Sequence, residues 1–162
     1  MTFTARAIPQ NVVQSLRDYV KTNITSVPVQ FGDGGQREEA APRWLEFTLQ
    51  EAALSYQRHT ASSSTKGGVR VGLLAVALRE KWPLQDGDNI FSLDALLRTV
   101  LQLFHPGQTI SVKDFAGGSE AVFGLVEVRS TSGKTEVSDG RDDPQVRQWS
   151  VVITLEWIEE WT

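Results

Sequence analysis

Few side chains in this 162-residue chain are suited to acid–base chemistry or metal binding. There are two histidines, His59 and His105, and no cysteine. His59 stands beside a Ser/Thr-rich stretch. His105 follows a candidate helix, where a cationic side chain suits the negative helix end. Because neither histidine has neighbours at the spacing of metal ligands, we expect structural or surface roles for both and no metal site.

Two groups of carboxylates could form a reactive or ligating site. Glu156 and Glu160 would share one face of a strand, with Glu159 between them, but catalytic acids need a convergent partner that is missing here. The run "SDGRDD" at 138–143 places three aspartates around a glycine. It lacks the alternating ligands and the closing glutamate of a calcium loop. We interpret the glutamates as the solvated side of a strand and the aspartates as a hairpin tip.

The small-residue runs resemble reactive motifs only superficially. "GDGG" at 32–35 lacks the spacing of a phosphate-binding loop, and no Lys-Ser/Thr pair follows it. "SSS" at 62–64 has no base beside it that would activate a nucleophile. The sequence therefore predicts no catalytic residues and no cofactor, and a protein that is not an enzyme. The alternative is an enzyme with a site assembled from residues that look unremarkable in sequence.

The stretch "QWSVVITLEWIEEWT" at 148–162 carries three of the five tryptophans. Read with period two, one face is almost wholly apolar and the other is mixed, which predicts a strand packed on one side. At ~3.3 Å per residue it would reach roughly 40 Å, about the width of a small domain. It therefore either crosses the whole sheet or extends onto a neighbouring subunit. The apolar face consists of Trp149, Val151, Ile153, Leu155, Trp157 and Trp161.

Tryptophans in such a strand could stack on sugars or bases. On an apolar strand face they are more often anchors of a core or of a protein interface. We predict that Trp149 lies inside the subunit and that Trp157 and Trp161 anchor an interface. The alternative, in which all three simply cover helices of the same chain, remains open at this point.

Composition indicates one ordinary globular domain spanning residues 1–162. The chain is 40% hydrophobic and 22% charged, with a net charge of −4 and a pI near 5.2. It lacks the basic surplus of a general nucleic-acid binder. The apolar runs are too short and interrupted to cross a bilayer. The first ten residues lack the apolar segment of a signal peptide, so we expect synthesis in the cytoplasm.

Two helices are predicted from apolar residues at helical spacing. The first covers 9–23 and starts at a proline, which suits a first helical turn. The second covers 92–104, with Ser92 as N-cap and Asp94 near the positive helix end. "HPG" at 105–107 ends it.

Strands are expected in six places. Residues 51–58 either continue the second strand after a bulge or form a helical turn. The third strand is apolar on both faces, so we place it centrally and covered on both sides. The six are 27–31, 43–50, 69–80, 108–115, 121–129 and the terminal stretch.

Polar loops separate these elements at 59–68 and 130–145, and their composition predicts mobility until a partner is bound. Grouped helices and strands joined by hairpins favour an α+β domain. We expect a mostly antiparallel sheet of five to six strands, two main helices packed on one of its faces, and long exposed hairpin loops.

The layout resembles the tail terminator proteins of long-tailed bacteriophages. The resemblance rests on element order across most of the chain. It is carried by "GGVRVGLLAVALRE" behind a flexible loop, "SLDALLRTVLQLF" as a helix, and "VRQWSVVITLEW" in the terminal strand. The acidic loop at 130–145 and the length of the terminal strand depart from the family pattern.

The resemblance implies a structural virion protein without catalysis or cofactor. Such proteins form a six-membered ring on the finished tail tube, stop its polymerisation and present a surface to the head. The implied partners are other copies of the chain, the tail tube protein and a head–tail connector protein. DNA would pass through the ring lumen without sequence-specific contacts, and no membrane is involved. The implied location is the head-proximal end of the tail, after synthesis in the host cytoplasm.

Two other functions remain open from the sequence. One is another head–tail connector or tail assembly protein, and the other is a non-viral protein-interaction subunit without catalysis. In either case we predict that subunit or partner contacts involve the two tryptophans and basic residues of the two polar loops. These five residues are Trp157, Trp161, Lys66, Lys134 and Arg141.

Overall fold

Two helices and a seven-stranded sheet form the part of the chain that the computed structural model describes, residues 9–32, 41–59, 66–81, 92–115, 118, 121–137 and 146–161. This is the expected α+β fold, with one strand more than predicted. In chain order the elements are α1 (Pro9–Asn23), β1 (Val29–Phe31), β2 (Arg43–His59), β3 (Lys66–Lys81), α2 (Ser92–Leu103), β4 (Thr109–Lys113), β5 (Val122–Thr131), β6 (Thr135–Val137) and β7 (Val146–Trp161).

The sheet has the strand order β1-β2-β3-β7-β5-β4, and β6 pairs with β7 beside β5. Its centre is the antiparallel pair β3–β7, whose register runs without a shift from Lys66↔Trp161 to Lys81↔Val146. All other pairs are antiparallel except β1–β2, which is parallel. The sheet is therefore mixed, with its one parallel pair among the described strands at the β1 edge.

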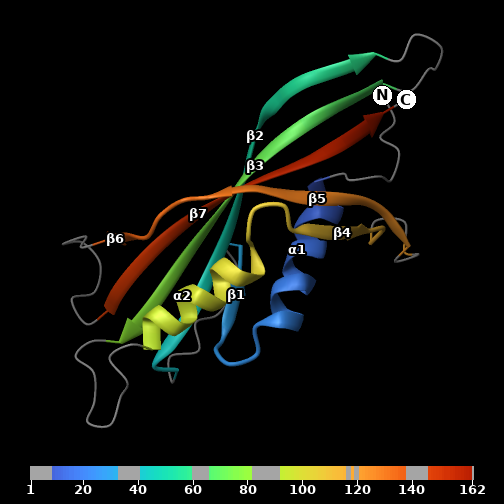
Figure 1. The fold of residues 1–162 in the computed structure, drawn as a ribbon. Helices are drawn as coiled ribbons and strands as arrows, with labels where there is room; N and C mark the ends of the chain where they lie inside the picture. Colours follow the sequence, from blue (N-terminus) through green and yellow to red (C-terminus); the bar gives the residue numbers. More distant parts are fainter. Residues whose placement is uncertain are drawn as a thin grey trace.

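The core lies between one face of the sheet and the two helices (Figure 1). Val12, Leu16 and Val20 recur at helical spacing on α1 and are fully buried. The alternation predicted for the terminal strand is present in β7. Trp149, Val151, Ile153, Leu155 and Trp157 are buried, and the residues between them are half-buried or exposed.

The predicted position of β3 is confirmed only in part. The strand is central, but the helices cover a single face. On the opposite face, hereafter the outer face, Leu73 is 37% exposed and its neighbours Val71 and Ala75 are half-buried. The expectation that β3 is covered on both sides is wrong for the described part of this single chain. Apolar composition on both faces of a strand does not require that its own subunit supplies both covers.

Strand ends account for the other differences. Residues 51–58 continue β2 as a strand, with register shifts between Glu51 and Leu54 and between Leu54 and Tyr56. The expected loop at 59–68 is shorter, because β3 begins at Lys66. Within the expected loop at 130–145, residues 130–131 belong to β5 and 135–137 form β6, whose backbone pairs with β7 although Thr135 and Glu136 are polar. Residues 60–65 and 138–145 of the two loops lie outside the described residues.

Three strands extend past the helices as an arm. It consists of residues 54–59 of β2, 66–70 of β3 and 157–161 of β7. Figure 1 shows these strand ends pointing together away from α1 and α2, at the upper right. Because β5 pairs with β7 only as far as Trp157, the last residues of β7 are held by β3 alone among the described strands.

Candidate assembly surfaces

Trp157, predicted to anchor an interface, is a core residue. Its side chain is 2% exposed within the single chain. The ring lies over Gly72 of β3, where an added Cβ would be 2.7 Å from ring atom Cζ3. Since burial is complete without a second subunit, we correct the prediction for Trp157. The shared period-two phase of the tryptophans concealed the difference, because the glycine that makes room for this ring is on another strand.

Two other predicted residues meet at the tip of the arm. Lys66 and Trp161 are register partners in the β3–β7 ladder, and His59 of β2 pairs with Lys66 on its other side. The backbone of these three positions is described, whereas the orientation of their side chains is not. Lys66 was predicted in a flexible loop and instead starts a strand. The structure therefore places two predicted interface residues next to each other at the end of the sheet.

Lys134 lies at the opposite end of β7, beside Trp149. Its Nζ is 3.6 Å from the centroid of the indole ring, and the guanidinium carbon of Arg147 is 4.7 Å from the same centroid. Both distances are within the range of cation–π contacts. Trp149 is buried, as predicted for an internal residue. Lys134 thus stays at the surface but is held by an aromatic contact within its own subunit. Arg141, also predicted at an interface, lies outside the described residues.

An ion pair inside the same end of the sheet was not anticipated from the sequence. Nε of Arg43 is 2.7 Å from Oε1 of Glu80, whose side chain is 1% exposed. The two residues are cross-strand partners in the β2–β3 ladder. A charge placed among apolar strand residues could have signalled such a pair, because a buried carboxylate needs a compensating partner.

The outer face carries exposed apolar side chains. Ile158 is 60% exposed and Leu125 is 54% exposed, and both lie on neighbouring strands next to the Trp157–Val126 pair. Leu73 and Val152 continue the apolar surface along β3 and β7. Large exposed apolar groups on one face are typical of protein contact surfaces.

A charged cluster borders this apolar surface. Arg129 donates to Glu127 at 2.8 Å and to Glu156 at 2.7 Å. The hydrogen bond to Glu156 raises the pKa of the Arg129 guanidinium above its usual value, and the charge of Glu127 acts in the same direction. The exposed pairs contribute little to stability, as is usual at a protein surface.

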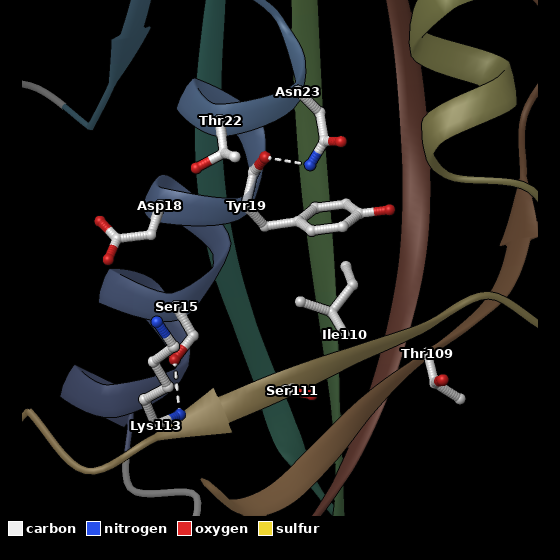
Figure 2. A pocket seen from close by; sticks show the side chains of 9 residues that line it. All are labelled: Ser15, Asp18, Tyr19, Thr22, Asn23, Thr109, Ile110, Ser111 and Lys113. Atoms are coloured by element: carbon white, nitrogen blue, oxygen red, sulfur yellow. Dashed lines mark hydrogen bonds between the residues drawn. The ribbon is translucent and has the colours of Figure 1, made fainter. Parts of the chain in front are cut away.

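A sheet edge with which no described strand pairs is the remaining candidate surface. β4 is the last strand of the sheet, and a groove of about 290 Å³ lies between its outer edge and α1 (Figure 2). Polar residues of both elements line the groove, including Asp18 and Thr22 of α1 and Thr109 and Ser111 of β4. The sequence signal was the alternation of polar and apolar residues along 109–113, which does not reveal whether an edge is paired.

No grouping of three or more His, Cys, Asp or Glu residues suited to a metal ion occurs in the described part of the chain. Among the described helices, none has the length and apolar character needed to cross a membrane. His105 is exposed, and its Nδ1 lies 3.1 Å from the Pro106 carbonyl oxygen, which agrees with a surface role.

Comparison with known proteins identifies the fold alone. No protein-family model and no curated protein sequence matches this chain. Solved structures do match, in 24 chains. One of them, a protein whose name states no activity, has a TM-score of 0.53 and 18% sequence identity, and the similarity covers 94% of this chain and 93% of that chain. The helices and mixed sheet described above are thus an arrangement that this chain shares with a known structure.

Proposed function

We propose that this protein is a structural subunit that caps the tail tube of a long-tailed bacteriophage as a six-membered ring. In this role it ends polymerisation of the tube and forms the surface that joins the head. The protein acts by contact and not by catalysis, so no cofactor takes part. Its partners are further copies of itself, the tube protein and a head–tail connector protein, and DNA passes through the lumen. It resides at the head-proximal end of the virion tail after synthesis in the host cytoplasm.

The observation that carries this proposal is the open sheet. The two edges of the sheet differ. One edge is β4, and at the other edge β1 pairs only with residues 45–47 of the much longer β2. A subunit with two different sheet edges can join its neighbours head to tail. Such contacts close into a ring when the rotation between subunits permits it. Unpaired strand edges in a monomer are otherwise a liability.

The arm and the outer face support the same function. The arm reaches beyond the core and carries Lys66 and Trp161 at its tip. The outer face presents Leu73, Val152 and Ile158. An assembly protein needs such surfaces for its neighbours in the tail, because stable contacts bury apolar groups surrounded by polar ones.

Negative-stain electron microscopy of the purified protein tests the proposal. We expect ring-shaped particles, and rings at one end of tubes when the tube protein of the same phage is added. The proposal would be contradicted if the protein formed no ring and did not bind tube ends. If it then bound one unrelated soluble protein, the non-viral interaction subunit would be the better description.

A further inference from the structure

The hydrogen bonds around β4 determine which backbone groups face its free edge. The Gln108 carbonyl accepts from Val128 N–H at 2.8 Å, and Asp114 N–H donates to the Ala121 carbonyl at 2.9 Å, so even-numbered residues are turned toward β5 and its turn. Because backbone groups alternate along a strand, Thr109, Ser111 and Lys113 face outward. The Lys113 N–H confirms this direction, since it donates to Oγ of Ser15 on α1 at 3.0 Å.

The centre of this edge is open. At one end the Thr109 carbonyl accepts from the side chain of Gln108, and at the other end the Lys113 carbonyl accepts from Phe115 N–H. The N–H and carbonyl of Ser111 between them have no partner within the described residues. Figure 2 shows α1 and β4 diverging from the Ser15–Lys113 contact, so that Ser111 and Thr109 border the groove. An extended backbone supplies the alternating donors and acceptors that such an edge binds.

The arm offers a strand edge of the matching kind. Among the described strands, none pairs with β2 on its outer side after Phe47. The two register shifts of β2 lie between Glu51 and Tyr56, and residues 56–59 are in regular register with β3. This run of four residues is close in length to the five of β4. It contains no proline, which would remove a backbone donor.

We propose that residues 56–59 in the arm of one copy pair with the β4 edge of the next copy, beside α1. The proposal rests on the ring function above and identifies its subunit contact. Residues 56–59 of β2 and the β4 edge lie at opposite edges of the same sheet. Each copy can therefore pair through its arm with one neighbour and through β4 with the other. The sheets of neighbouring subunits then join head to tail around the ring. The contact also brings Lys66 and Trp161, which are next to the donated strand, close to the neighbouring subunit.

A matched pair of substitutions tests the acceptor edge. Ser111→Pro removes the outward N–H, while the groups that bind β5 belong to residues 110 and 112. Ser111→Ala keeps the N–H. We expect rings with the alanine variant and at least a tenfold loss of ring formation with the proline variant. Circular dichroism and thermal unfolding of both variants establish that each is folded.

Cysteine cross-linking tests the contact without relying on the proline variant. The chain has no cysteine. Protein with Ser111→Cys is therefore mixed with a second variant that carries one cysteine at position 56, 57, 58 or 59. The mixture is then oxidised. We expect a disulfide-linked dimer with at least one of the four. Thr99→Cys, on the exposed side of α2, replaces Ser111→Cys in the control and should give none.

The outcomes separate this contact from the proposed function. Rings lost only with the proline variant, together with a cross-linked dimer, support both. Rings with both Ser111 variants and no cross-link at any of the four positions overturn the strand contact and leave the ring intact. Tube protein that no longer binds the proline variant, with self-assembly unchanged, assigns the edge to the tube and overturns pairing between copies. A parent chain that stays monomeric, together with cysteine variants that give no cross-link at any of the four positions, contradicts the ring and the contact together.

Discussion

Trp157 and Gly72 are in direct contact across the β3–β7 pair. A Cβ added to Gly72 would lie 2.7 Å from Cζ3 and 2.8 Å from Cη2 of the indole ring. The ring therefore packs against the β3 backbone, at the point where the arm leaves the helix-covered part of the sheet. This packing makes Trp157 an anchor of its own subunit.

We predict that Gly72→Ala destabilises the fold by about 1–3 kcal/mol, because a rigid ring must shift to admit the methyl group. Thermal or urea unfolding measures the loss, and tryptophan fluorescence should change with it. Gly133→Ala is the control, since nothing lies within 4 Å of the added methyl group. Equal stability of the two variants would show that the ring can move without cost.

Deletion of residues 159–162 should leave a folded subunit that assembles poorly. The core face of β7 is complete at Trp157, and residues 159–161 pair only with 66–68 of β3 in the described structure. An interface tryptophan can contribute ~2 kcal/mol or more per contact. Thermal unfolding and negative-stain microscopy are applied to the same variant. A large fall in Tm with normal ring formation would show that Trp161 stabilises its own subunit and does not anchor an interface.

Arg43→Ala should reduce the free energy of unfolding by about 3–5 kcal/mol, because it leaves the buried Glu80 carboxylate without this cation. Arg129→Ala provides the comparison. Its pairs with Glu127 and Glu156 are shorter than 3 Å as well, but Arg129 is 47% exposed, so its loss should leave the free energy of unfolding nearly unchanged. Urea unfolding at neutral pH measures both. Similar losses for the two variants would mean that burial does not decide the strength of the Arg43–Glu80 pair.

Tyr19 links the two helices through a hydrogen bond from its hydroxyl to the Leu103 carbonyl at 3.0 Å. Tyr19→Phe should cost about 0.5–1.5 kcal/mol at neutral pH. Partial burial raises the pKa of Tyr19 above its ordinary value of 10.0. The folded state then holds this proton more tightly than the unfolded state, so its contribution is present below pH 10 and is lost as pH rises further.

Unfolding experiments across pH 8 to 11 compare the parent with Tyr19→Phe. The difference in stability between them should shrink above pH 10. A difference that stays constant would show that the folded and unfolded states bind this proton equally.

The parts of the fold that sequence could predict are those governed by local periodicity. Apolar residues at helical spacing located α1 and α2, and period two in β7 identified its buried face. Periodicity could not show which strands pair with β2 and β4, because strand order depends on contacts between segments that are distant in the sequence. The parallel β1–β2 pair and the pairing of the short β6 with β7 could not be predicted for the same reason.

The predicted interface residues illustrate the same limit. Trp157 and Trp161 occupy equivalent positions in a period-two pattern, yet Gly72 receives the first and the arm tip carries the second. Lys134 was identified as a basic loop residue, but only the approach of β6 to β7 places it over Trp149. The spacing of residues along one strand carries no information about the side chains of the neighbouring strands.

The central claim is that this chain assembles into a closed ring. Its most direct test is the molar mass of the purified parent protein by size-exclusion chromatography with multi-angle light scattering, over a range of concentrations. We predict a single species of six times the 18.0 kDa chain mass, which persists on dilution to micromolar protein. A mass of one chain at every concentration, up to the highest that stays in solution, would contradict the claim.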